Sequence, residues 1–461
     1  MHPRVAAKAV LAGLITGGLI VAATTPAHAR TRAARATLAA RPATAAVTAG
    51  DPTSVRLQLR PAAVTRLQVQ ERVAGRWVAR TSAVTSSRGA AVARLSPATA
   101  GVHTYRAITL RTTGRAASPT FAVTVAPAGS ACAPTTPLVD DQATPAARCL
   151  AARLDRWRKA GVMGVGQQLN VSNISYRQPL DTLGGRRVSV VGFDLQELAD
   201  GQTYQFPTAP LDALGQLAQQ GAVLSATWHA HNPRNGVANS FQDDPWHDLG
   251  PLLDPSTPEY STFWVDFDAK MALLKQLQDQ YGVAVVFRPF HEVNGDWFWW
   301  GRPDPTTFRK VWKAMQERAA VDGVHNVLWA YSFNADTGPR TVKPVSLLPP
   351  VSRVDLAGID SYGSPATAKQ PATLPMTGYA AVAALVTRMT ITEAGPYNST
   401  TGRWNPEVIT AAARAQSSKP LWSMLWFDDG SGKKQISSLG PNGSWGKAWL
   451  DSCPQGFCSL F

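Results

Sequence analysis

The sequence predicts an α/β protein whose main part is a (β/α)8 TIM barrel, preceded by a small all-β sandwich of immunoglobulin-like pattern. Two observations support this prediction. From about residue 148 onward, short apolar runs alternate with helical patterns eight times, whereas residues 51–126 alternate apolar and polar side chains between glycine-containing turns. The chain of 461 residues is long enough for a barrel of about 250 residues and one smaller domain.

Residues 1–29 have the pattern of a secretory signal peptide. Arg4 and Lys8 precede an apolar run over residues 10–23, and the small residues Ala27 and Ala29 provide a cleavage site. The alternative is a membrane anchor, but the run is shorter than the ~20 residues that a spanning helix requires. We therefore expect a secreted, extracellular protein without membrane insertion.

The next segments differ in composition. Residues 30–50 are rich in Ala, Thr, Arg and Pro and predict a flexible leader, and residues 127–147 predict a Pro/Ala/Thr linker. The accessory sandwich lies between them. A carbohydrate-binding module needs exposed aromatic side chains, and this region offers only Trp77, Tyr105 and Phe121. We expect these three in the core, which favours a spacer role.

Positive charge is concentrated at the N-terminal end. Residues 1–130 carry 17 Lys and Arg against two acids, Asp51 and Glu71, whereas the remainder carries 28 basic and 29 acidic residues. The basic region fits association with an anionic cell wall or polymer, but arginines that solvate the outer faces of strands are the plainer interpretation. The sequence contains no segment that combines basic and aromatic residues in the way of a nucleic-acid-binding module. We expect the protein to be a monomer.

The four cysteines allow three disulfide pairings. Export makes disulfides chemically reasonable, and we favour Cys132–Cys149 and Cys453–Cys458 because each pair is close in sequence. A zinc site is disfavoured because the sequence has no CxxC pair.

Residues 148–461 contain the predicted barrel. Near-continuous apolar strands are typical of a parallel sheet that is buried on both faces. A spacing of 61 residues between the third and fourth strands predicts a large loop that carries Trp246 and Trp264. The eight predicted strands cover residues 162–166, 188–192, 222–226, 283–287, 326–330, 354–358, 389–392 and 421–425.

Polar and aromatic residues follow these strands, at the end where barrels carry out their chemistry. Glu292 follows the fourth strand and Glu393 the seventh, so the two lie roughly across the barrel from each other. Glycoside cleavage needs such a pair, because one carboxyl group protonates the leaving oxygen while the other attacks the anomeric carbon. A strand-end salt bridge is the alternative for either glutamate alone.

Residues 288–301 (RPFHEVNGDWFWWG) closely resemble the acid/base segment of glycoside hydrolase family 26. Residues 392–395 (TEAG) look like that family's nucleophile segment, although this motif alone is weak. Residues 166–168 (GQQ) and 228–233 (WHAHNP) are similar to its first-strand and third-strand motifs. The resemblance covers about residues 148–450 and leaves the sandwich out.

The resemblance implies a retaining enzyme with Glu292 as acid/base and Glu393 as nucleophile. We expect no metal and no cofactor. It also implies that Arg288 orients Glu393 and that Tyr362 hydrogen-bonds it. Most members are endo-β-1,4-mannanases, so a mannan-type polysaccharide is the expected substrate. Mixed-linkage β-glucan, β-1,3-xylan and a catalytically inactive glycan-binding protein are the alternatives.

Further side chains are candidates for sugar contacts. His229 and His291 are expected to hydrogen-bond hydroxyl groups, and Trp297 and Trp426 to stack on pyranose rings. Trp299 and Trp300 fit either packing or sugar contact, and the roles of Asp360 and Asn334 stay open. Metalloprotease chemistry is disfavoured because residues 290–294 do not form an HExxH motif.

Overall fold

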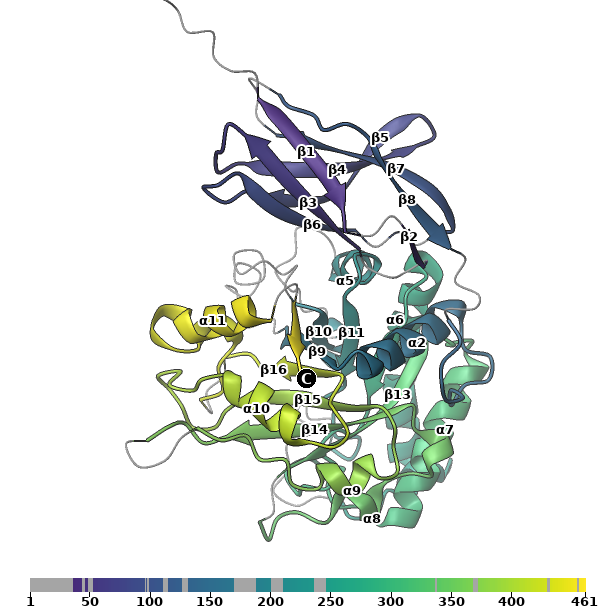
Figure 1. The fold of residues 1–461 in the computed structure, drawn as a ribbon. Helices are drawn as coiled ribbons and strands as arrows, with labels where there is room; N and C mark the ends of the chain where they lie inside the picture. The colour runs from purple at the N-terminus through teal and green to yellow at the C-terminus, as the bar shows by residue number, and fades with distance from the viewer. Residues whose placement is uncertain are drawn as a thin grey trace, which may run out of the picture.

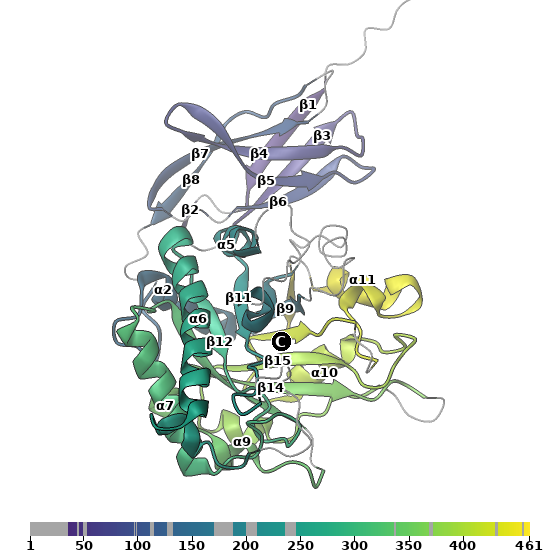
Figure 2. The ribbon, with the colours of Figure 1, turned by 180° about the vertical axis from the view of Figure 1, so that it is seen from behind.

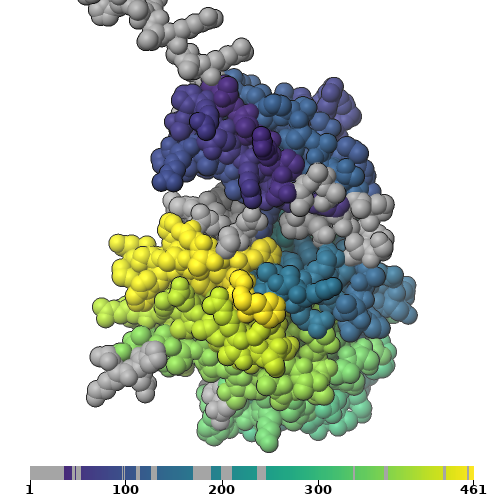
Figure 3. Space-filling model, viewed as in Figure 1, coloured from purple at the N-terminus to yellow at the C-terminus, as the bar shows by residue number. Residues whose placement is uncertain are grey.

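The computed structural model describes residues 36–461, except for residues 44–45, 49–52, 96, 98, 111–114, 127–131, 170–187, 200–209, 236–245, 336–337, 368–371, 429–431 and 454–455. The predicted signal peptide therefore lies outside the described residues. None of the helices in the described part of the chain is both long enough and apolar enough to cross a membrane. An all-β part in purple and blue lies against a larger α/β part in teal to yellow (Figures 1 and 3).

The all-β part consists of two sheets, one lying across the other (Figures 1 and 2). Alternate residues point inward, as in β3, where Val55, Leu57 and Leu59 are buried and the residues between them are not. One sheet has the order β1 (Thr37–Pro42), β3 (Thr53–Arg60) and β6 (Ala90–Leu95). The other has the order β2 (Ala46–Thr48), β8 (Phe121–Ala126), β7 (Gly101–Thr109), β4 (Arg66–Val73) and β5 (Arg76–Val84).

Two expectations for this region differ from the structure. Strands β1 and β2 lie within residues 30–50, where a flexible leader is predicted; β1 is held by its pairing with β3 and by the buried Leu38. Trp77 is not in the core. It pairs with the exposed Arg72 on the outer face of the five-stranded sheet, whereas Tyr105 is buried and Phe121 packs against the core.

The α/β part is a closed ring of parallel strands, which confirms the predicted (β/α)8 barrel. Strand β10 pairs with β9 and completes the ring, and the short antiparallel β17 (Phe457–Ser459) adds to the start of β9. All eight ring strands overlap the predicted runs. They are β9 (Val162–Gln168), β10 (Val190–Asp194), β11 (Val223–Thr227), β12 (Val285–Arg288), β13 (Val327–Asn334), β14 (Leu356–Gly363), β15 (Met389–Pro396) and β16 (Trp422–Leu425).

Helices lie around the ring (Figures 1 and 2). The sequence explains the ends of α6, because Thr257 caps its first turn with its side chain, Pro258 is its first residue, and Gly282 ends it at a φ of 61°. The sequence predicted Trp264 in a large loop, and this prediction is wrong. Trp264 is buried and lies within helix α6. The helices are α2 (Pro145–Lys159), α4 (Leu195–Ala199), α5 (Pro210–Gln219), α6 (Pro258–Tyr281), α7 (Pro305–Val321), α8 (Pro344–Leu347), α9 (Tyr379–Ala383), α10 (Glu407–Ala415) and α11 (Ser444–Ser452).

A buried ion pair joins the first helix of this part to the start of a late strand. Arg388, next to β15, donates two hydrogen bonds of 2.8 and 2.9 Å to Asp155 of α2, and both side chains are almost fully buried. The backbone N–H of Thr135 donates to the same carboxylate. Both predicted disulfides, Cys132–Cys149 and Cys453–Cys458, are confirmed.

Candidate active site

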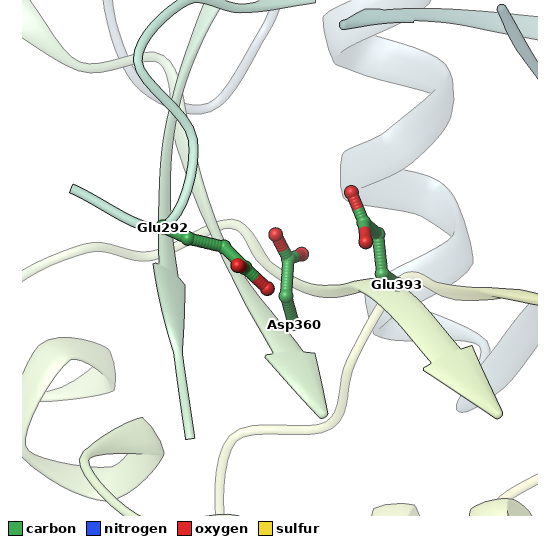
Figure 4. Close-up of side chains that lie close together, drawn as sticks. All are labelled: Glu292, Asp360 and Glu393. Carbon is green, nitrogen blue, oxygen red and sulfur yellow. The ribbon is translucent and has the colours of Figure 1, made fainter. Parts of the chain in front are cut away.

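Three carboxylates, from three of the ring strands, meet at the carboxyl-terminal side of the ring. Glu292 follows β12, Asp360 lies on β14, and Glu393 lies on β15. One oxygen of each lies within 4.8 Å of the others, and their side chains converge on one space (Figure 4). All three are buried. The two glutamates thus lie close together, although about a hundred residues separate them along the chain.

The backbone around Glu292 is held in an unusual conformation. Phe290 and Glu292 have φ angles of 50° and 54°, in the left-handed region that side chains with a Cβ rarely occupy. The N–H of Glu292 donates a hydrogen bond of 3.0 Å to the carbonyl of Ser332 on β13. The turn that follows Arg288 therefore directs the Glu292 side chain toward the site, and such strain is typical of functional positions.

Glu292 is poised to hold a proton near neutral pH. Burial raises its pKa to about 7, and the charge of Glu393 acts in the same direction. The Lys433 charge and two hydrogen bonds oppose this shift. Those bonds come from Trp297 Nε1 to Oε2 at 2.6 Å and from Asn334 Nδ2 to Oε1 at 2.7 Å.

Glu393 is held from two sides. Arg288 donates from one terminal nitrogen to Oε1, and the hydroxyl of Tyr362 donates to Oε2 at 2.6 Å. Tyr362 lies on β14, and its pKa is raised well above its usual value by burial and by the Glu393 charge, so it stays a donor. Both contacts fix the orientation of the carboxylate, which accepts a hydrogen bond on each of its oxygens.

Arg288 also binds Asp360. Its other terminal nitrogen lies 2.9 and 3.2 Å from the two oxygens of Asp360, and Ser332 Oγ donates to the same carboxylate at 3.1 Å. Burial raises the pKa of Asp360 well above its usual value, and the charge of Arg288 only partly offsets this shift. Arg288, itself fully buried, is the cation that holds Asp360 and Glu393 together.

Three carboxylates at this spacing also meet the distance requirement for a metal ion. Their oxygens, however, already have protein partners. Arg288 bonds two of the carboxylates, and each oxygen of Glu292 accepts a hydrogen bond from a side chain. The donor set therefore fits acid/base and nucleophilic chemistry better than metal ligation.

Two histidines lie beside the carboxylates, and their surroundings shift their pKa values in opposite directions. Burial disfavours a charged His229, but Asp194, whose Oδ2 lies 2.5 Å from its Nδ1, more than offsets this and raises its pKa. Burial has the largest effect on His291. Together with the charge of His229, it lowers the pKa of His291 well below its usual value. The centres of the two rings are 4.5 Å apart. His291 Nδ1 has no hydrogen-bond partner among the described residues.

The aromatic side chains near the carboxylates form two groups: one lies at the site, and the other is packed in the core. Trp297 is only partly buried and reaches Glu292, and Trp426 lies against Phe427 with ring centres 4.7 Å apart. Trp299 and Trp300 are fully buried, and their indole N–H groups donate to backbone carbonyls. The structure thus assigns this second pair to packing, an alternative that the sequence left open.

Sequence reasoning did not single out Asp194 or Lys433, and it left Asn334 and Asp360 without a role. Asp194 and Asn334 end their strands, and Asp360 follows the apolar first half of β14, which is a signal that the sequence contains. Lys433 follows β16 by eight residues, and its Nζ lies 4.3 Å from the centre of the Tyr362 ring. A lysine in a connecting segment carries no such signal.

Comparison with known proteins identifies a family. The sequence model of Glycosyl hydrolase family 26 matches residues 139–445. Mannan endo-1,4-beta-mannosidase A of Piromyces sp is 30% identical over 144 residues, which is 31% of this chain and 22% of that protein. Mannan endo-1,4-beta-mannosidase of Bacillus subtilis is 29% identical over 227 residues, which is 45% of this chain and 57% of that protein. The chain thus covers less than two thirds of either relative.

A solved structure has the same fold. The mannanase man26 of Bacillus subtilis superposes with a TM-score of 0.54 and 21% sequence identity. The match covers 66% of this chain and 93% of that chain. At this identity the likeness supports a shared fold and says nothing further about the substrate.

Proposed function

Because the chain belongs to glycosyl hydrolase family 26, we propose that it is a secreted retaining hydrolase that cleaves the β-1,4-linked backbone of mannan or galactomannan. The observation that carries the mechanism is the approach of Glu292 and Glu393 oxygens to within 4.8 Å. Retaining glycosidases keep their two carboxyl groups about 5–5.5 Å apart, whereas inverting enzymes leave room for a water at about 6.5–9.5 Å.

In the first step of the proposed reaction, Glu393 attacks the anomeric carbon while Glu292 protonates the departing glycosidic oxygen. The C–O bond to the leaving sugar breaks, and a covalent glycosyl ester forms on Glu393. Arg288 and Tyr362 hold the attacking carboxylate in one orientation, which reduces the entropic cost of reaching the transition state.

In the second step, Glu292 accepts a proton from water, whose oxygen attacks the anomeric carbon and releases Glu393. A pKa of about 7 suits both roles, because near neutral pH the same group can give up a proton and take one back. Once the ester forms, Glu393 no longer bears a charge. The repulsion that helps to raise the Glu292 pKa then disappears, which favours its ionised form for this step.

His229, His291, Trp297 and Trp426 are proposed to bind the sugar beside these carboxylates. The raised pKa of His229 favours its protonated form, which donates hydrogen bonds, whereas the His291 ring is packed against Phe298 and Trp300. The partly buried indole of Trp297 offers an apolar face to a pyranose ring. The mannan assignment rests on the printed activity of the curated relatives.

Release of reducing sugar from a polymer panel tests this function. We expect cleavage of galactomannan in preference to lichenan and β-1,3-xylan, and none by a Glu393→Ala control. Preference for lichenan or xylan would keep the mechanism and change the substrate. If the wild-type protein cleaves none of the polymers but binds them, it is the inactive glycan-binding protein and the proposal fails.

Secretion is proposed on separate grounds. Residues 1–29 have the composition of a signal peptide, and the two disulfides suit an oxidising environment. Expression of the full chain in an exporting host should yield mature protein in the medium that begins near residue 30. Retention of the intact N-terminus inside the cell would contradict this proposal.

A further inference from the structure

We propose that the outer face of the five-stranded sheet binds an acidic polysaccharide, a linear glycan that carries carboxylate groups. This face is remote in sequence from the catalytic pair, and the inference does not depend on which glycan the barrel cleaves. It replaces the spacer role that the sequence favoured for this part with a binding role.

The charge of the all-β part is strongly one-sided. The described residues between 36 and 126 include eleven arginines, no lysine and a single acid, Glu71. Glu71 is buried, and its two oxygens are bound by Arg80 and His103. In the described portion of this region the surface therefore carries positive charge without an exposed carboxylate to balance it. A polyanion is the partner that this charge complements.

The strand register places several of these arginines on one face. On β4, Arg66, Gln68, Gln70 and Arg72 alternate with the buried Leu67, Val69 and Glu71, so the first four point outward together. Trp77 of β5 pairs with Arg72, and Arg106 of β7 pairs with Gln70. Arg66 and Arg72 are exposed, and no carboxylate among the described residues lies within ion-pair distance of either.

The centre of this face is held in place before any ligand binds. The Arg106 guanidinium lies 4.3 Å from the centre of the Trp77 ring. Its Nε donates to Gln70 Oε1 at 3.0 Å, and Gln70 Nε2 donates to Gln68 Oε1 at 2.8 Å. The guanidinium is thus fixed through its Nε and its flat face, which leaves its terminal N–H groups to bind a carboxylate without a further loss of side-chain freedom.

The residue types favour an acidic glycan over other polyanions. Guanidinium groups match the planar geometry of a carboxylate, and the neighbouring amides and Thr104 supply hydrogen-bonding groups for hydroxyls. Binding of single-stranded nucleic acid relies on several aromatic platforms, whereas Trp77 is the one aromatic residue that the described strands place on this face.

Binding of the full-length protein to polygalacturonate at about 0.15 M salt tests the proposal. We expect retardation in gels that contain this polymer. The variant Arg66→Gln/Arg72→Gln/Arg106→Gln should bind at least tenfold more weakly, and Trp77→Ala should also weaken binding. A matched control is Arg41→Gln/Arg56→Gln/Arg60→Gln, which removes the same charge from the outer face of the other sheet. Its affinity should stay within twofold of wild type.

Three results would overturn the proposal: no binding of the wild-type protein to polygalacturonate, equal losses in the two triple variants, or tighter binding to duplex DNA or to anionic lipid vesicles under the same conditions. Equal losses would mean that net charge alone drives the association. Unchanged circular dichroism and unchanged polysaccharide hydrolysis in all variants would show that the fold is intact.

Discussion

The indole N–H of Trp297 donates a hydrogen bond of 2.6 Å to Oε2 of Glu292. This bond favours the ionised carboxylate, whereas burial and the charge of Glu393 favour the protonated one. The pKa of about 7 is the balance of these opposing effects. In the proposed mechanism, that balance decides the pH range in which Glu292 can act as an acid.

The first prediction concerns the pH dependence of hydrolysis. Glu292 must be protonated to act on the substrate, so kcat/KM should fall as pH rises through about 7. Glu292→Gln should abolish this alkaline limb and lower kcat/KM by about 10²–10⁴-fold. A pH–rate profile with a leaving group that needs protonation measures both effects. A profile that stays flat to pH 9 would assign the acid role elsewhere.

The second prediction changes the hydrogen bond to Glu292. Trp297→Phe removes a donor that stabilises the ionised form, so the alkaline limb should move to higher pH by about one unit. Trp299→Phe is the matched control, because its indole bonds the Ala230 carbonyl instead. The control should leave the limb in place and lower stability. An alkaline limb at the same pH in wild type and in Trp297→Phe would show that this hydrogen bond does not affect the pKa of Glu292.

The third prediction concerns Arg288. Arg288→Gln leaves the buried carboxylates of Asp360 and Glu393 without their cation, so the free energy of unfolding should fall by about 3–5 kcal/mol. Arg288→Lys keeps the charge but cannot bond both carboxylates, so it should recover stability more than kcat. Urea denaturation and steady-state kinetics measure the two quantities. Equal stability of Arg288→Gln and wild type would contradict this account of the ion pairs.

The fourth prediction concerns the structural ion pair between Asp155 and Arg388. Burial acts to raise the pKa of Asp155, but the hydrogen bonds and charge of Arg388 outweigh it, so the pKa is lowered. A lowered pKa contributes stability above the unfolded-state value of about 4, and this contribution is lost as pH falls through the folded-state value. Asp155→Asn should therefore destabilise the protein by about 3–5 kcal/mol at pH 7 and by less at pH 3.

The exposed Asp141→Asn is the control for this comparison and should change stability by no more than about 0.5 kcal/mol. Denaturant midpoints at pH 7 and pH 3 decide the matter. If Asp155→Asn loses more stability relative to wild type at pH 3 than at pH 7, the predicted pH dependence of this ion pair is wrong.

The barrel was predictable because its strands are marked locally. Runs such as residues 222–226 and 421–425 are apolar without interruption, and each lies next to a helical pattern. Strand β1 has no such uninterrupted apolar run. Its residues are mostly Ala, Thr, Arg and Pro, and it forms because Leu38 finds the core and because β3 supplies partners some twenty positions away. Nonlocal pairing of this kind leaves little trace in one strand's own composition.

The site was predictable in part for the same reason. Glu292 follows the apolar strand β12 and Glu393 follows the apolar first residues of β15, so the closure of the barrel brings them together. The pairing of Asp194 with His229 joins two neighbouring strand ends, and the position of Lys433 over Tyr362 depends on the path of a connecting segment. Trp77 was misplaced because a tryptophan in a strand fits either face, and only the register decides which one it occupies.

Trapping of the covalent intermediate tests the central claim most directly. A 2-deoxy-2-fluoro-mannoside with a good leaving group should inactivate the enzyme, and mass spectrometry of its peptides should find one sugar attached to Glu393. Glu292→Gln should still accumulate the adduct with a leaving group that needs no proton. Attachment to another residue, or turnover without any adduct and with inversion at the anomeric carbon, would contradict the account.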